Sequence, residues 1–570
     1  MKISDLVVDA LYDYGVRRVF EMSGGMITHL LDSIYRDGRI RLISTHHEQA
    51  AAFCADVTGR LTGIPGVALA TSGPGATNLL TGIGSCHFDS SPAVFIAGQV
   101  NRSEQKGARP IRQLGFQETD IVAMAGPITK ASWRVTTAEE VPYLLRDAFE
   151  LATAGRPGPV LLDIPMDVQR TESGAAASPL RPPTLLHPKP GLVDDVVARM
   201  AAARRPLLLV GGGVRAAGCH SAFREFASRA AVPVVYSLMG VDVVPFGDPL
   251  RVGMIGTYGN RWANLAIARC DFLLVIGSRL DIRQTGADVD AFAAGKCIAH
   301  VDCEPGEINN RVPGCVGVEA HIRPFLEEAL ARLGHHPGSD RSAWLRELAS
   351  LKEQWPDTNE QAETPGINPN VFMHELSRAA SAAAAFVVDV GQHQMWAAQS
   401  LELGARQRFI TSGGMGAMGF GLPAAVGAAL EVGCVVMVGG DGGFQTNIQE
   451  LETVRRNNLP LKMVILNNRC HGMVRQFQES YFEGRYQSTM WGYSVPNFVR
   501  VAEAYGIRGM SVESPSACGP ALEWLLTDPT AASLLEVRID TFANAYPKIA
   551  FGRPISEMEP FAKPIEEEST

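Results

Sequence analysis

Two small polar clusters bracket residues 440–472 and consist of residue types that bind metal ions. Asp441 follows the apolar run CVVMVGG, and Asn467-Asn468 closes the apolar run LKMVILNN. Because ligands of doubly wound sheets bind beyond the carboxyl ends of the strands, we expect both clusters at one edge. Carboxylate and amide oxygens suit Mg²⁺, which completes its octahedron with phosphate oxygens. The pattern predicts a magnesium diphosphate site; a helix cap and a turn are the structural alternative.

A carboxyl group near the N-terminus is the second candidate for chemistry. Glu48 stands in STHHEQAAAFCADVTGRLTG (residues 44–63), in front of an alanine-rich helical face with little other charge. A carboxyl group in such dry surroundings is suited to holding or transferring a proton. The structural alternative is an acid in the first turn of a helix, which the helix dipole favours.

The composition limits the class of protein. A chain of 570 residues with 46% hydrophobic and 19% charged residues is too long for one core, and it suits a soluble α/β protein of several domains. The net charge of −9 argues against a nucleic-acid partner. Ten scattered cysteines without a CxxC pair predict reduced thiols, no zinc site and a cytoplasmic location. We expect neither a signal peptide nor a membrane span.

Buried strands alternate with helical segments along the chain, which predicts three doubly wound parallel-sheet domains of the α/β class. We place these domains at residues 1–172, 190–338 and 366–545, with a linker rich in proline and alanine at 173–191 and a surface tail at 546–570. The expected strands are GVALATS (66–72), AVFIAGQ (93–99), GPVLLDIP (158–165), RPLLLVGG (205–212), VPVVYS (232–237), DFLLVIGSRL (271–280), CIAHVDCEP (297–305), AAFVVDVG (384–391), CVVMVGGDGG (434–443) and LKMVILNN (461–468).

The spacing of the two clusters resembles a known cofactor motif. The 24 residues from Gly443 to Leu466 separate GDG from NN, which is similar to the motif that binds thiamine diphosphate (ThDP). HEQAAAF and ATSGPGATN match the same family. With RPGPVLLDIP, VGGGV, DVGQHQMWAAQ, GGMGAMGFGLPAAVGAAL and NNRCHGMVRQFQ, residues 1 to 545 resemble the acetolactate synthase branch of the ThDP-dependent decarboxylases and carboligases.

This resemblance implies pyrimidine, middle and diphosphate domains in that order. It also implies a homodimer or homotetramer whose active sites combine the first domain of one subunit with the third of another. Glu48 would activate ThDP, and Phe116 and Gln117 would line the substrate side. The metal ligands would be Asp441, Asn468 and the carbonyl of Cys470. The expected ThDP contacts are Gly25, Ser72, Asn78, Gln392, His393, Gly416, Met418, Gly442 and Gly443.

Two of these assignments have a plain alternative. Met418 would bend the cofactor, and its alternative is an ordinary core methionine. An exposed loop would explain Phe116 and Gln117 equally well.

The middle domain resembles the FAD site of acetolactate synthases, where the flavin is structural. Gly212 in VGGGV, Arg279 in GSRLD and Asp302 in HVDCEP would contact FAD, although a sheet without flavin is the alternative. Arg283 matches an arginine that binds the carboxylate of the acceptor, and a surface ion pair is its ordinary fate.

The chain departs from biosynthetic acetolactate synthases on the acceptor side. Phe477 replaces a tryptophan tied to acceptor choice, Thr257 replaces a methionine and Met166 replaces a lysine. The tail resembles those of relatives linked to surface-sugar biosynthesis. We therefore expect decarboxylation of pyruvate and transfer of the two-carbon unit to a second carbonyl compound. The alternatives are transfer to a keto-sugar nucleotide or other ketone, and a regulatory relative without catalysis.

Overall fold

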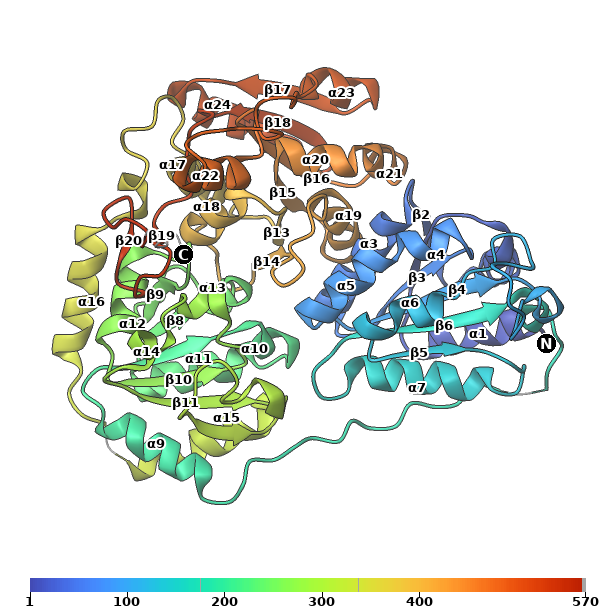
Figure 1. The fold of residues 1–570 in the computed structure, drawn as a ribbon, viewed down its shortest axis with the longest axis horizontal. Coiled ribbons are helices and arrows are strands. Elements are labelled where there is room, and N and C mark those ends of the chain that lie inside the picture. Colours follow the sequence, from blue (N-terminus) through green and yellow to red (C-terminus); the bar gives the residue numbers. More distant parts are fainter. Residues whose placement is uncertain (175, 337, 566–570) are drawn as a thin grey trace.

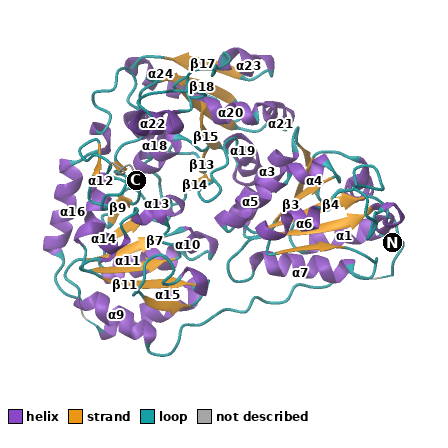
Figure 2. Ribbon diagram, in the orientation of Figure 1, coloured by secondary structure: helices purple, strands orange, loops and turns teal. Residues whose placement is uncertain are grey.

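The protein, described by a computed structural model for residues 1–174, 176–336 and 338–565, contains three six-stranded sheets. Figure 1 shows one lobe for each sheet: the blue N-terminal lobe on the right, the green middle lobe at the lower left and the orange and red C-terminal lobe at the top. Figure 2 shows strands flanked by helices in each lobe. The prediction of three α/β domains is confirmed.

The N-terminal sheet is parallel and has the strand order β2-β1-β3-β4-β6-β5. Its strands are β1 Arg18–Glu21, β2 Arg41–Ser44, β3 Gly66–Ala70, β4 Ala93–Gln99, β5 Ala131–Arg134 and β6 Pro159–Pro165. Its helices are α1 Ile3–Asp13, α2 Thr28–Asp37, α3 Glu48–Thr62, α4 Pro74–Asn78, α5 Leu80–Asp89, α6 Ile121–Ala125, α7 Val141–Thr153 and α8 Met166–Gln169. Every residue of β3, β4 and β6 is buried, which explains their continuous apolar sequences.

The middle sheet is also parallel, in the order β12-β11-β10-β7-β8-β9. Its strands are β7 Pro206–Val210, β8 Val234–Tyr236, β9 Arg251–Met254, β10 Phe272–Ile276, β11 Cys297–Asp302 and β12 Val316–Glu319. Its helices are α9 Leu192–Ala202, α10 Gly212–Ala216, α11 His220–Ala230, α12 Arg261–Arg269, α13 Ile282–Thr285, α14 Val289–Ala293 and α15 Ile322–Arg332, and α16 Ser342–Gln354 leads to the third domain.

The C-terminal sheet repeats this parallel arrangement in the order β14-β13-β15-β16-β18-β17. Its strands are β13 Ala385–Val388, β14 Arg408–Thr411, β15 Val435–Gly440, β16 Leu461–Asn467, β17 Arg508–Val512 and β18 Ser533–Arg538. Its helices are α17 Pro369–Ala379, α18 Gln392–Ser400, α19 Gly421–Val432, α20 Asp441–Thr446, α21 Leu451–Arg456, α22 Gly472–Tyr481, α23 Phe498–Ala504 and α24 Pro515–Leu526.

The linker and the tail behave differently from one another. Residues 176–189 form neither helix nor strand, as the linker prediction requires, and Figure 1 shows this stretch running between two lobes. We expected the tail to lie over the surface, but its residues Ile549, Ile555 and Met558 are buried in the core of the middle domain. The tail folds back on itself in a short antiparallel pair, β19 Lys548–Ile549 and β20 Met558–Glu559, and the N–H of Ile549 donates to the carbonyl of Thr257 in the middle domain at 2.8 Å. Residues 566–570 of the predicted tail lie outside the described residues.

The first and third domains of the chain pack against each other through α3 and α19. A side chain at Gly427 would lie 2.7 Å from the carbonyl oxygen of Cys54, and the Cys54 thiol donates to the carbonyl of Pro423 at 3.0 Å. Small residues on both helices therefore allow this close approach. The alanine-rich face that follows Glu48 is explained by this helix packing.

Candidate active site

The two polar clusters do lie at one edge of the C-terminal sheet. Strands β15 and β16 are parallel neighbours, with Gly440 paired to Leu466. Asp441 begins α20 directly after β15, and Asn468 directly follows β16. Both side chains are buried. Both groups therefore follow neighbouring parallel strands at the same edge of the sheet.

Hydrogen bonds connect this edge to helix α18. The amide of Asn468 donates to Oε1 of Gln392 at 3.1 Å, and the backbone N–H of Cys470 donates to Oδ1 of Asn468 at 3.3 Å. The amide of Gln392 in turn donates to Oε1 of Gln476 on α22 at 3.1 Å. Two residues predicted to bind the metal and one predicted to bind the diphosphate therefore lie in one network.

The glycines of the site are required by packing. A Cβ on Gly443 would lie 2.3 Å from Oδ2 of Asp389, and one on Gly442 would lie 2.8 Å from the ring of His471. At Gly472 the same atom would be 1.9 Å from Oε1 of Gln392. The lack of side chains at these glycines leaves room for Asp389, His471 and Gln392 to pack against the backbone of the site.

Buried ionisable groups near this edge fit a cation and an anion. Burial raises the pKa of Asp441 to about 7, against a hydrogen bond from Tyr493 that lowers it. Burial lowers the pKa of His393 to about 3, and its Nε2 atom has no hydrogen-bond partner among the described residues. A buried carboxylate without a cation is costly, and a buried unpaired nitrogen is as well. A divalent cation on Asp441 and a phosphate oxygen near His393 would satisfy both groups.

Glu48 is the first residue of α3, and its side chain is buried. Asn78 donates from Nδ2 to Oε2 of Glu48 at 2.9 Å. A side chain on Gly75 would lie 3.0 Å from the other carboxylate oxygen. Asn78, which we predicted as a cofactor contact, therefore holds the carboxyl group predicted to be catalytic.

The loop that carries Phe116 and Gln117 is fixed by Ser72. The Ser72 hydroxyl lies 2.7 Å from the carbonyl oxygen of Gln117 and 2.9 Å from Oε1 of Gln99. Gln117 has a φ of 64°, a left-handed conformation that is uncommon for a residue with a side chain. Phe116 is 79% exposed and is therefore open to a ligand or to another chain.

Gly25 is also open to a ligand or to another chain, because a Cβ on this residue would meet no atom within 4 Å.

The loop that carries Gly416 and Met418 is held from two domains. Asp389 accepts the N–H of Gly419 at 3.1 Å, and Asp89 of the first domain accepts the N–H of Gly414 at 2.6 Å. Met418 itself is 40% exposed. This exposure is unlike that of a core methionine.

The predicted catalytic residue Glu48 and the predicted metal ligand Asp441 are two centres with separate side-chain partners. Among the described residues, the side chain of Glu48 bonds to Asn78, and that of Asp441 bonds to Tyr493 at 3.2 Å. Large apolar side chains beside these centres, including Phe116, Met415 and Met418, are exposed.

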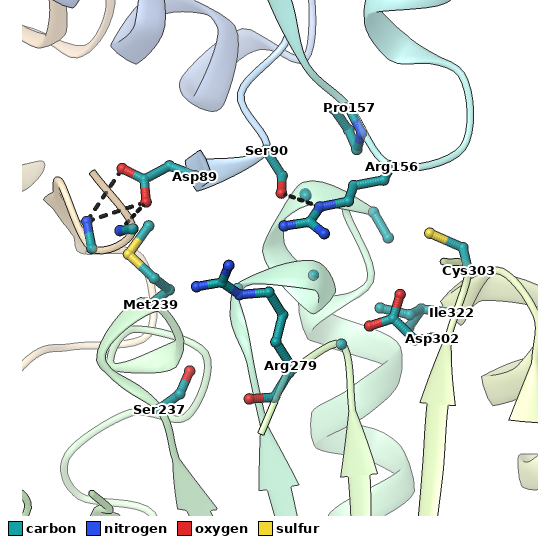
Figure 3. Close-up of a pocket in the computed structure, with 18 of the residues that line it drawn as sticks. Asp89, Ser90, Arg156, Pro157, Ser237, Met239, Arg279, Asp302, Cys303 and Ile322 are labelled. Atoms are coloured by element: carbon teal, nitrogen blue, oxygen red, sulfur yellow. Dashed lines mark hydrogen bonds between the residues drawn. The ribbon is translucent and has the colours of Figure 1, made fainter. Parts of the chain in front are cut away.

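A cavity of about 340 Å³ lies where the three domains meet, and Figure 3 shows part of its lining. Its wall contains the three residues predicted to bind FAD, namely Gly212, Arg279 and Asp302. Burial raises the pKa of Asp302. The volume suits a small-molecule site, and glycines, one arginine and one acid are the groups expected around a dinucleotide.

The residues predicted for the acceptor substrate lie in two places. Thr257 and Arg283 line the same cavity, and the N–H of Thr257 donates to the carbonyl of Arg283 at 2.6 Å. Phe477 is absent from that wall; it is half exposed on α22 and packs on Tyr481 with ring centroids 4.7 Å apart. Tyr481 in turn packs near Phe551 of the tail, with ring centroids 6.4 Å apart.

Sequence reasoning missed several residues that shape the site. Asp389 and Asp89 hold the Met418 loop, and Tyr493 contacts Asp441. Asp389 follows the strand in the run AAFVVDVG, as Asp441 follows its own strand. Its position at the end of a strand could therefore have identified it as a site residue. Asp89 and Tyr493 are separated from their partners by 325 and 52 residues, and nothing local marks them.

Comparison with known proteins assigns all three domains. Residues 1–124 match the family described as thiamine pyrophosphate enzyme, N-terminal TPP binding domain; residues 193–329 match the central domain and residues 389–537 the C-terminal TPP binding domain. Thiamine pyrophosphate is another name for ThDP. Fold, site and matches define a ThDP-dependent enzyme.

Full-length relatives make the assignment more specific. The chain is 38% identical over 562 residues to acetolactate synthase isozyme 2 large subunit of Escherichia coli (strain K12), covering 97% of this chain and 98% of the relative. It is 37% identical over 570 residues to acetolactate synthase 2, chloroplastic, of Nicotiana tabacum, covering 97% and 84%. The chain belongs to the acetolactate synthase large-subunit family. Among its described residues, no helix combines the length and apolar character needed to cross a membrane.

Proposed function

We propose that this chain decarboxylates pyruvate and joins the two-carbon unit to a second carbonyl compound, as the names of its relatives indicate for acetolactate. The observation that carries the proposal is the position of Asp441 and Asn468 directly after two neighbouring parallel strands, with the buried Glu48 in another domain. When bound, ThDP supplies the electron sink for loss of carbon dioxide. The protein contributes binding, orientation and exclusion of water.

Each protein group has a defined task in this proposal. Asp441, Asn468 and the carbonyl of Cys470 hold Mg²⁺, while Gln392 and His393 bind the diphosphate. Glu48 would hold the proton needed to activate bound ThDP, and the hydrogen bond from Asn78 keeps its carboxyl group in place. The backbone around Gly25, Ser72, Gly416, Gly442 and Gly443 and the side chain of Met418 shape the cofactor site.

The substrate side is formed by Phe116 and Gln117 together with Thr257, Arg283 and Phe477. An arginine fork is suited to a carboxylate, and the exposed Arg283 lines the cavity in which an acceptor acid would present that group. Phe477 is half exposed, which leaves room beside it for an acceptor larger than pyruvate. A keto-sugar nucleotide or another ketone is therefore the second acceptor class to test.

The proposal includes FAD in the central cavity and a dimer or tetramer as the working unit. The cavity wall supports the first, because all three residues predicted for the flavin line it. The exposed apolar side chains of Phe116, Met415 and Met418 support the second, because a second copy of the chain would cover them. Ten free cysteines suit a reducing compartment such as the cytoplasm.

A mass-spectrometric screen with labelled pyruvate tests the proposal. Purified protein with ThDP and Mg²⁺ should release labelled carbon dioxide and form acetolactate from pyruvate alone. Release that rises sharply only with an added ketone would favour the second acceptor class. Absence of both would refute the proposal.

A further inference from the structure

Tyr493 reaches the proposed metal-binding carboxylate from a loop that no motif marks. Its hydroxyl donates to Oδ2 of Asp441 at 3.2 Å. The same hydroxyl accepts a hydrogen bond from Nε2 of Gln445 at 3.4 Å, and that Gln445 amide also donates to the backbone carbonyl of Asp441 at 3.0 Å. The phenol therefore joins a closed set of contacts around one aspartate.

The ring of Tyr493 is held in place as firmly as its hydroxyl. It packs on the ring of His471 with centroids 4.4 Å apart. A Cβ on Gly442 would lie 2.8 Å from the His471 ring and 3.3 Å from the Tyr493 oxygen, so glycine is needed for this pair to approach the turn after Asp441. His471 is anchored by its own N–H, which donates to the carbonyl of Thr489 at 3.1 Å.

This geometry has a consequence for metal binding. A carboxylate that ligates Mg²⁺ must present one oxygen in a nearly fixed direction, because the ion tolerates little departure from an octahedron. The phenol donates to Oδ2, and the backbone N–H groups of Gly442 and Arg469 also bond to the carboxylate. Among the described residues, Tyr493 supplies the side-chain donor to this carboxylate and so helps to fix its rotation.

We propose that Tyr493, supported by His471 and Gln445, is a positioning residue that orients Asp441 for the divalent cation. The inference rests on the proposed metal site. Hydrogen-bond partners of metal ligands typically change metal affinity about 10- to 100-fold when they are removed. Tyr493 acts on metal binding through Asp441 and has no part in the chemistry at the substrate.

Tyr493→Phe tests the inference because it removes one oxygen and keeps the ring on His471. The full-length protein is titrated with MnCl₂ at saturating ThDP, and free Mn²⁺ is counted by electron paramagnetic resonance. We expect Tyr493→Phe to weaken Mn²⁺ binding about tenfold, with the melting temperature of the metal-free protein unchanged. Activity should return at saturating MgCl₂, so that the half-saturating metal concentration changes and turnover does not.

Two further variants separate the possible failures. Tyr486→Phe is the matched control, because the Tyr486 ring packs on Trp491 and its hydroxyl makes no hydrogen bond among the described residues; it should bind Mn²⁺ as the wild type does. Asp441→Asn should abolish tight binding. If Asp441→Asn weakens binding and Tyr493→Phe does not, the role of Tyr493 is refuted. If neither variant weakens binding, the metal site itself is wrong.

Discussion

Asn78 donates a hydrogen bond to Glu48 across 2.9 Å, joining the end of α4 to the start of α3. This contact gives the carboxyl group one fixed polar neighbour in otherwise buried surroundings. A proton-handling group needs a defined orientation as well as an altered environment. The pair therefore links the fold of the first domain directly to the proposed chemistry.

Replacement of the acid tests its role. Glu48→Gln keeps the size of the side chain but cannot cycle a proton, so turnover should fall by about 10² to 10⁴, the usual contribution of a positioned acid or base. The exposed Glu139→Gln is the control and should be fully active. The rate of carbon dioxide release from labelled pyruvate is the measurement. Wild-type turnover in Glu48→Gln would remove the assignment.

Asn78→Ala tests the orientation of Glu48. Because hydrogen bonds to charged groups contribute about 1.5–3 kcal/mol, we expect turnover to fall by about tenfold to a hundredfold. The KM for pyruvate should change little, since Asn78 acts on Glu48. The matched control is Asn101→Ala, which removes another asparagine-glutamate contact, to Glu104 at 2.8 Å on the surface. Equal losses in both variants would contradict a specific role for Asn78.

His374 makes the stability of the third domain depend on pH. Its ring contacts Asp357 at 3.0 Å and Glu402 at 2.9 Å. Burial alone would lower the pKa of His374, but the hydrogen bonds and charges of these acids raise it above 6.5. A raised folded-state pKa means that the charged ring adds stability that is full below pH 6.5 and is lost as the pH rises through the folded-state pKa.

His374→Gln should therefore lower the unfolding temperature most below pH 6.5, where the ring is charged, and least at alkaline pH above the raised folded-state pKa, where the ring is neutral. His335→Gln replaces an exposed histidine, so the difference in unfolding temperature between this variant and the wild type should not change with pH. Thermal unfolding followed by circular dichroism gives both curves. A difference that grows with pH would show that the neutral ring is the stabilising form.

Arg279→Ala tests the central cavity. Arg279 lines the wall, and its ion-pair partner among the described residues is Asp281 at 3.2 Å, so most of its guanidinium is available to an anionic ligand. We expect FAD to bind about tenfold more weakly, as for the loss of one hydrogen bond to a charged group. Arg199→Ala breaks a comparable surface pair with Asp195 and should bind FAD normally. Flavin fluorescence quenching measures both, and wild-type protein that binds no added FAD would contradict the assignment.

The sequence predicted the features that depend on local pattern. Apolar runs marked the buried strands, and because parallel strands end at one edge, Asp441 and Asn468 could be placed together before the structure was known. Features that depend on packing between distant segments could not be predicted from the local sequence pattern. The contact of Tyr493 with Asp441, the support of Gly414 by Asp89 and the burial of Met558 in the middle domain all arise from tertiary packing.

The acceptor side shows the same limit. Thr257 and Arg283 could be matched by position, but their common place in the cavity depends on three domains meeting. The distance between Phe477 and that cavity depends on how α22 lies against the tail, which the sequence pattern does not specify. Substrate choice therefore needs a direct measurement.

The most direct test of the central claim follows the first carbon of pyruvate. Protein freed of cofactor is given carboxyl-labelled pyruvate with ThDP and Mg²⁺, with either one omitted, and with candidate ketones added. The account predicts that labelled carbon dioxide appears only when ThDP and Mg²⁺ are both present, and that the remaining two carbons are recovered in a larger product. Pyruvate that keeps its label under every one of these conditions would contradict it.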